Sequence, residues 1–327
     1  MRYAFLFLVL TVISCSNSKQ DTTTIDKGTE QPAVVVPVFN ADSTYSYLKM
    51  QVDFGPRVPG TEAHKNCAEY LFEKLRTYCD TVIIQSAPIK TFDGNTFILK
   101  NIIASFNPQA ANRMLLSAHW DTRPWADGDS TDKYKPFDGA DDGASGVAVL
   151  IEVARQLKEN KVQQGVDIVL FDLEDYGQEQ NDERFPQQQN TWCLGSQYWA
   201  KNLHVKNYAA QYGILLDMVG GSNAIFPMEG TSLQYAPNQT KMIWDVANQL
   251  GYSSYFSYAQ TNPTIDDHLY VNTLANIPCV DIVHYKVELS RYASHHHTHA
   301  DNISVIDKNT LKVTGSVLMH LLYAQPL

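Results

Sequence analysis

Acidic and histidine side chains directly follow several short apolar segments of this chain. Residues 169–171 precede three acidic residues within four positions, and residues 214–216 end at another acid. Carboxylates repel one another and resist burial, so such clusters require a cation or a catalytic reason. The acids and histidine at these segment ends and in the glycine-flanked turn at 139–143 are His119, Asp121, Asp141, Asp142, Asp172, Glu174, Asp175 and Asp217.

A run of histidines at residues 295–299 could add one imidazole to this set. Mixed histidine and carboxylate ligands suit zinc, and a catalytic zinc keeps three protein ligands and an open position. A single aspartate after a strand more often caps a helix or closes a turn, and the histidine run could be a solvated loop. Several such segment ends in one chain are hard to explain in that way, so the sequence predicts a zinc centre.

The elements that must position these side chains alternate between strands and helices. Near-continuous apolar runs such as 166–171 are typical of parallel strands that are covered on both faces. Apolar residues recur at helical spacing in 144–157. The sequence therefore predicts an α/β fold with a mixed, mainly parallel central sheet flanked by helices, with ligands beyond the carboxyl ends of the strands. The expected strands are 81–89, 96–106, 113–118, 166–171, 213–216 and 277–283, and the expected helices are 42–52, 61–76, 144–157, 194–203, 240–250 and 307–322.

The first residues have the features of an export signal. Arg2 precedes an apolar stretch at 3–13 that is too short to span a bilayer as a mature helix, and residues 12–15 resemble a bacterial lipobox. We therefore expect residues 1–14 to be a lipoprotein signal peptide, Cys15 to be the lipid anchor, residues 15–40 to be a flexible tether, and residues 41–327 to be a single zinc-dependent catalytic domain. An ordinary signal peptide cut nearby is the alternative. The implied location is that of an exported bacterial lipoprotein, membrane-anchored and facing the periplasm.

The overall composition excludes some classes of partner. A formal net charge of −10 argues against nucleic acid. No segment after residue 13 is long and apolar enough to cross a membrane. Four cysteines remain after Cys15, with no CxxC pair among them, and we expect free, partly buried thiols.

The order of the motifs resembles the M28 zinc aminopeptidase superfamily, whose fold we therefore expect. Within it the chain is more similar to the animal-type glutaminyl cyclases, the glutaminyl-peptide cyclotransferases. The element Asp266-Asp267-His268 is the best discriminator, because it is typical of cyclases. The residues that carry the superfamily resemblance are His119-x-Asp121, the turn at 139–146, Glu174-Asp175, Asp217 and His297-Thr298-x-x-Asp301.

The resemblance also implies roles for individual residues. The metal ligands would be Asp142, Asp175 and His297. Glu174 would be the catalytic proton carrier, with Asp217 and Asp266 as its acidic partners. The substrate pocket would include Trp192, Tyr292 and His296.

The chain departs from the animal cyclases at two of these positions and at a third, residue 281. Asp175 stands where they have a second glutamate, and its shorter arm requires some backbone adjustment. His296 replaces a tryptophan, so Trp192 or Trp120 would have to supply the missing aromatic surface. Asp281 replaces a histidine that supports the acidic partner.

The activity implied is zinc-dependent cyclisation of N-terminal glutamine, and more slowly glutamate, to pyroglutamate with release of ammonia. Its substrates would be peptides and exported proteins with an N-terminal glutamine, and one zinc per chain would polarise the γ-carbonyl. The main alternative is a di-zinc aminopeptidase, in which Glu174 would activate a water that bridges the metals. A non-catalytic peptide-binding lipoprotein is a further alternative. The five ligand positions of the aminopeptidases are matched by His119, Asp142, Asp175, Asp217 and His297.

Overall fold

Near-continuous apolar runs form the strands at the centre of the molecule. The computed structural model describes residues 1, 2, 4 and 35–325, and within them a six-stranded sheet has the order β1-β2-β4-β3-β5-β8. The strands β4, β3, β5 and β8 run parallel, whereas β2 is antiparallel to both β1 and β4. The predicted α/β fold with a mixed, mainly parallel sheet is confirmed. The strands are β1 Thr81–Lys90, β2 Thr96–Phe106, β3 Arg113–His119, β4 Gly165–Phe171, β5 Tyr212–Asp217 and β8 Cys279–Val283.

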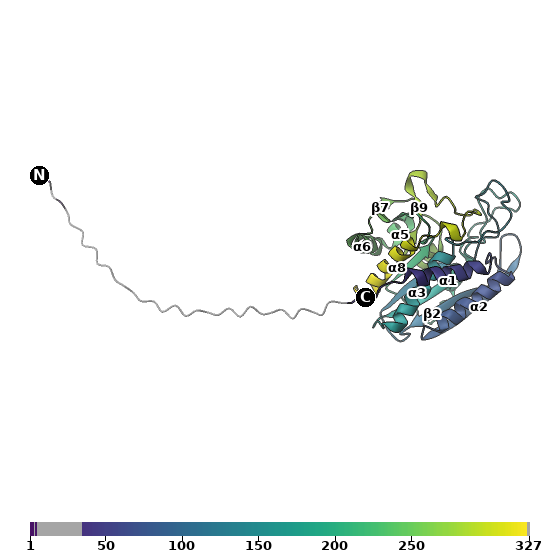
Figure 1. Cartoon of the computed structure of the whole chain (residues 1–327), viewed down its shortest axis with the longest axis horizontal. Coiled ribbons are helices and arrows are strands. Elements are labelled where there is room, and N and C mark those ends of the chain that lie inside the picture. The colour runs from purple at the N-terminus through teal and green to yellow at the C-terminus, as the bar shows by residue number, and fades with distance from the viewer. Residues whose placement is uncertain (3, 5–34, 326–327) are drawn as a thin grey trace. The chain divides into compact units, whose positions relative to one another are not determined.

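Helices cover both faces of this sheet. One layer contains α1, α2, α3, α6 and α8, and the opposite face is covered by α4 and α7. Figure 1 shows α1, α3 and α8 side by side, in agreement with their mutual contacts. The helices are α1 Ala41–Asp53, α2 Glu62–Arg76, α3 Ala144–Glu159, α4 Leu194–Lys201, α6 Pro237–Gln249, α7 Asp267–Thr273 and α8 Lys308–Tyr323.

Successive strand residues serve opposite layers, because side chains alternate across a sheet. In β3, Leu116 packs with the cluster that includes α1 and α3, while Leu115 packs with Trp199 of α4 and Val271 of α7. Burial of each such aliphatic side chain contributes about 1.5–3 kcal/mol. The two apolar layers thus hold the strands in the register that aligns their carboxyl ends.

The chain beyond β5 contains short elements that the sequence analysis did not anticipate. Each is only two to seven residues long, so no periodic pattern of apolar residues can build up. Two short strand pairs also form, β6 with β7 and β9 with β10. The unanticipated elements are β6 Phe226–Met228, α5 Gly230–Tyr235, β7 Phe256–Gln260, α7 Asp267–Thr273, β9 Tyr285–Lys286, β10 Arg291–Tyr292 and the 3-10 turns Val287–Leu289 and Ile303–Val305.

The thiol prediction can be checked over the described part of the chain. Cys67, Cys79, Cys193 and Cys279 are free there, and all but the half-buried Cys79 are buried. None of the helices in residues 35–325 combines the length and the apolar character that crossing a membrane requires. The predicted lipid anchor, Cys15, lies outside the described residues.

Candidate active site

Three neighbouring parallel strands bring their carboxyl ends to one edge of the sheet. His119, the last residue of β3, lies in register with Phe171, the last residue of β4, and Asp217 ends β5. The chain then turns sharply, with Leu173 at φ 55° and Met218 at φ 47°. Non-glycine residues rarely adopt such angles, and they concentrate at functional sites. Strand topology therefore gathers side chains that are far apart in the sequence.

A fourth group reaches this edge from the turn before α3. The carboxylate of Asp301 accepts hydrogen bonds from the backbone N–H groups of Asp141 at 2.8 Å and Asp142 at 3.0 Å. Asp301 belongs to the same loop as His297. One loop therefore both supplies the histidine and holds the turn that presents Asp142.

The three predicted metal ligands converge at this edge. Nε2 of His297 lies 3.0 Å from Oδ1 of Asp175 and 3.7 Å from Oδ2 of Asp142. Both carboxylate oxygens are buried, and neither has a hydrogen-bond partner within the described residues. Ligands bound to tetrahedral zinc at about 2.0–2.1 Å lie about 3.3 Å apart. The spacing and the unpaired oxygens therefore fit a zinc ion between these side chains.

The acids of this site are difficult to keep ionised together unless a cation is present. Burial and the charge of Asp142 raise the pKa of Asp175 to about 6, against the opposing effect of His297. Burial raises the pKa of Asp217 to about 7, although a hydrogen bond from His119 opposes the shift. A bound divalent cation would offset both the burial and the repulsion.

His119 marks a second position that requires a proton or a cation. Its Nε2 lies 3.0 Å from Oδ1 of Asp142 and 3.2 Å from Oδ1 of Asp217. Burial opposes protonation, but hydrogen bonds to Asp121, Asp142 and Asp217 raise the pKa of His119. Ligand atoms of His119, Asp142 and Asp217 also lie close enough together to hold a metal ion. The geometry thus accommodates either a protonated His119 or a second metal.

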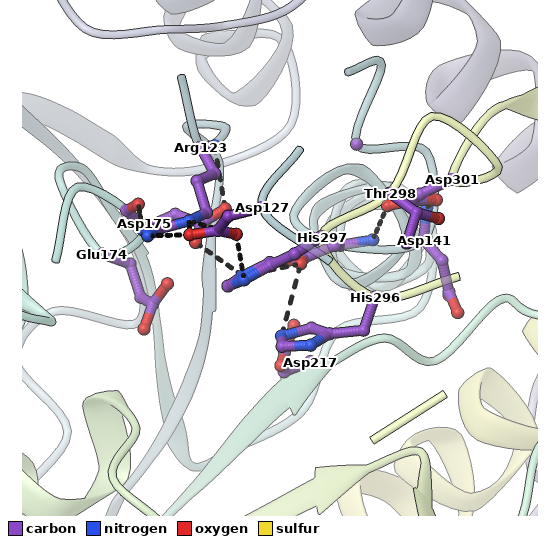
Figure 2. A network of polar contacts seen from close by, with 12 residues as sticks. Arg123, Asp127, Asp141, Glu174, Asp175, Asp217, His296, His297, Thr298 and Asp301 are labelled. Carbon is purple, nitrogen blue, oxygen red and sulfur yellow. Dashed lines mark hydrogen bonds and ion pairs between the residues drawn. The ribbon is translucent and has the colours of Figure 1, made fainter. Parts of the chain in front are cut away.

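A cavity with about 580 Å³ of empty space, including its open mouth, lies over these residues. The structure brings together all nine residues that were predicted for catalysis, metal binding and the pocket, since each of them lines this cavity. Figure 2 shows Glu174, Asp175, Asp217, His296 and His297 close to one another. The lining consists of Asp142, Glu174, Asp175, Glu179, Trp192, Asp217, Ile265, Asp266, Tyr292, His296 and His297.

Glu174 is held so that its carboxylate faces the cavity. Its backbone N–H donates to Oδ1 of Asp121 at 3.1 Å, and the thiol of Cys193 donates to its Oε1 at 3.2 Å. Burial and the charges of Asp175 and Asp266 raise the pKa of Glu174 well above its usual value, against the opposing charge of His119. A carboxyl group with a raised pKa can accept and release a proton near neutral pH.

The aromatic wall comes from Trp192 and not from Trp120. The indole of Trp192 stacks on His297, with ring centres 5.9 Å apart and planes 7° apart. Tyr292 lies against His296, with ring centres 4.7 Å apart. Trp120 is fully buried and stacks instead on His64.

Two other acids named in the sequence analysis lie outside this cavity. Asp172 does not line the cavity; its carboxylate accepts from Nε2 of His64 and from the backbone of Lys100, both at 2.8 Å. Asp281 is buried on β8, 3.9 Å from Nδ1 of His268, and it also lies outside the cavity lining.

Sequence reasoning did not identify Arg123, Asp127, Glu179 and Ile265 as neighbours of the site. Arg123 and Asp127 lie in the loop after β3, and both contact predicted metal ligands. The only sequence signal was that this loop directly follows His119-x-Asp121. Its partners lie 52 to 170 positions further along the chain, where local patterns carry no information.

Histidine and carboxylate ligands at the carboxyl edge of a mainly parallel sheet define an α/β metalloenzyme, with zinc as the best-suited metal. The model of peptidase family M28 matches residues 101–322. The chain therefore belongs to peptidase family M28, as its motifs predicted.

Three relatives are informative. A Zn-dependent exopeptidase from Parabacteroides distasonis has a TM-score of 0.86 and 46% identity, covering 88% of this chain and 99% of that one. Bacteroides thetaiotaomicron glutaminyl cyclase, solved with N-acetylhistamine, has a TM-score of 0.86 and 45% identity over the same shares. The Drosophila melanogaster glutaminyl-peptide cyclotransferase is 29% identical over 78% of this chain and 73% of its own length. The predicted similarity to glutaminyl cyclases is confirmed.

Proposed function

We propose that this chain is a glutaminyl-peptide cyclotransferase. It converts the N-terminal glutamine of peptides and exported proteins to pyroglutamate with release of ammonia, and it acts more slowly on glutamate. The observation that carries the proposal is the position of Asp266, which lines the same cavity as Glu174 and Asp217. Asp266 begins the Asp-Asp-His element that is typical of cyclases. The similarity to cyclases from an insect and a bacterium supports the same activity.

The cavity residues account for the proton movements of this reaction. A bond forms between the α-amine nitrogen and the side-chain carbonyl carbon, and the bond from that carbon to the amide nitrogen breaks. Glu174 accepts a proton from the α-amine and delivers it to the leaving nitrogen, which departs as ammonia. Zinc, when held by Asp142, Asp175 and His297, supplies a Lewis acid for the carbonyl.

The remaining residues hold the substrate. Asp217 orients the α-amine, and Asp266 shares a proton with Asp217 or Glu174, because crowded buried acids titrate as a group. Trp192 and Tyr292 give the glutamine side chain an apolar wall. Amine and carbonyl belong to one residue, so holding them in line supplies a large part of the rate acceleration.

The experiment that tests this function uses two sets of peptides. Purified protein is incubated with glutaminyl peptides and with leucyl peptides, and the products are followed by mass spectrometry. We expect the glutaminyl peptides to lose ammonia and the leucyl peptides to persist. Release of free leucine without ammonia loss would contradict the proposal.

A di-zinc aminopeptidase is the second candidate, favoured by the contacts of His119 with Asp142 and Asp217. We propose one zinc per chain, with a proton on His119. Zinc content, measured on the native protein and on a His119→Ala variant, separates the two functions. A content near one zinc per chain in both proteins supports the cyclase. A content of two in the native protein that falls to one in the variant supports the peptidase.

We also propose export and lipid anchoring for this enzyme. The support is the apolar segment 3–13 and the Val-Ile-Ser-Cys sequence that ends at Cys15, followed by a tether up to residue 40 and a catalytic domain from residue 41. The anchor would hold the enzyme at a membrane, facing the periplasm. Mass spectrometry of the mature N-terminus tests this, because an unmodified residue 15, or cleavage elsewhere, would contradict it.

A further inference from the structure

The loop after β3 binds Asp175 from two directions. The backbone N–H of Arg123 donates to Oδ2 of Asp175 at 2.8 Å, while Oδ1 of that carboxylate faces His297. The guanidinium of Arg123 donates to the backbone carbonyls of Asp175 and Gly177, both at 3.0 Å. One residue therefore fixes both the side chain and the backbone of this metal ligand.

The same guanidinium holds Asp127, which contacts the histidine ligand. Nε of Arg123 lies 3.0 Å from both carboxylate oxygens of Asp127. Oδ1 of Asp127 lies 3.4 Å from Nδ1 of His297. Figure 2 shows Asp127 between Arg123 and His297. A carboxylate at Nδ1 keeps the proton on that nitrogen, which leaves Nε2 free to bind a metal.

Arg123 also packs against the pocket wall. Its guanidinium carbon lies 4.6 Å from the ring centre of Trp192, and that ring also stacks on His297. The Arg123 side chain is almost completely buried, with 1% of its surface exposed. A buried guanidinium is retained when its donors are satisfied, and here the carboxylate and two carbonyls satisfy them.

We propose that Arg123 and Asp127 form a positioning pair that determines the zinc affinity of the Asp175–His297 half of the metal site. The inference rests on the zinc site of the proposed function. One methylene group joins the carboxylate of Asp175 to its backbone, so the reach of that carboxylate depends on where the backbone is held. Arg123 fixes that backbone, and Asp127, which Arg123 holds, orients the His297 ring.

The test measures zinc affinity without substrate, using competition with a chromogenic chelator. We expect Asp127→Ala and Arg123→Met to weaken zinc binding about 10- to 100-fold, as is usual when the partner of a metal ligand is removed. Arg123→Lys should recover little of the lost zinc affinity, because an ammonium group cannot bind a carboxylate and two carbonyls at once as the planar guanidinium does. The zinc affinity of Asp127→Asn should lie between those of the wild type and Asp127→Ala.

Arg113 provides a matched control. It is also a buried arginine, bound through two nitrogens to Asp167 at 2.7 Å and to backbone carbonyls, but it begins β3 whereas the site lies at the other end of that strand. We expect Arg113→Met to lower the melting temperature and leave zinc affinity unchanged. Circular dichroism identifies any variant that fails to fold, in which case the isosteric Asp127→Asn carries the test.

Zinc affinity within 3-fold of wild type in folded Asp127→Ala and Arg123→Met would overturn the proposal. Equal losses in the Arg113 control would also overturn it, because the effect would then follow from stability. Neither result depends on turnover, so failure of this inference is distinguishable from failure of the cyclase assignment.

Discussion

Replacing Glu174 with glutamine removes the proposed proton carrier and changes little else. The residue is held by its backbone N–H on Asp121 and by the thiol of Cys193 on Oε1. A glutamine has the same shape, and its amide oxygen can still accept from the thiol. The metal ligands Asp142, Asp175 and His297 are untouched. The change therefore tests chemistry and not assembly of the site.

The size of the effect follows from the role of the side chain. General acid–base catalysis by one positioned group contributes about 10²- to 10⁴-fold, or about 2.7–5.4 kcal/mol of transition-state stabilisation. We expect kcat for a glutaminyl peptide to fall by that factor, with KM changed only a few-fold. Ammonia release is followed continuously, and zinc content is determined on the same samples.

Glu179→Gln is the matched control. Glu179 lines the same cavity, but its side chain is 47% exposed and it has no proposed role in proton transfer. We expect its kcat to stay within a few-fold of wild type. If Glu174→Gln kept its zinc and turned over at the wild-type rate, Glu174 would not be the proton carrier and the mechanism would be wrong.

Three other predictions concern the pocket, the metal and stability. Gly177→Ala would place a Cβ 1.9 Å from the ring of Trp192 and displace that wall, so we expect KM for glutaminyl peptides to rise at least about 10-fold, measured by initial rates. Removing zinc with a chelator should abolish activity, and adding zinc to 100 times its Kd should restore it and raise stability by about 2.7 kcal/mol, read by thermal melting. Burial opposes ionisation of Glu229, but the hydrogen bond from His268 and those from backbone N–H groups lower its pKa from 4.5 to about 2. Because the folded-state pKa is depressed, this contribution of about 3 kcal/mol is present above pH 4.5 and is lost as the pH falls from 4.5 to 2. The stability of Glu229→Gln should therefore not show this loss between pH 4.5 and 2. An acid transition identical to that of the wild type would contradict the role of Glu229.

The strands and long helices could be predicted because their signals are local. The run at 166–171 is apolar except for Asp167 and became β4, and the helical spacing in 144–157 became α3. Elements such as α5 and α7 were missed because a helix of six or seven residues carries less than two turns of pattern. Their positions depend on packing against the rest of the domain.

The sequence by itself determined which chemistry was available. It placed histidine and carboxylate groups at strand ends, and parallel strands carry their carboxyl ends to one edge of a sheet, so Glu174, Asp175 and Asp217 had to meet. Only the tertiary structure decided how that chemistry is held. The choice of Trp192 over Trp120 and the support of Asp175 and His297 by Arg123 and Asp127 depend on contacts between loops far apart in the chain. Local patterns do not encode such contacts, because each loop takes its shape from the partner it meets.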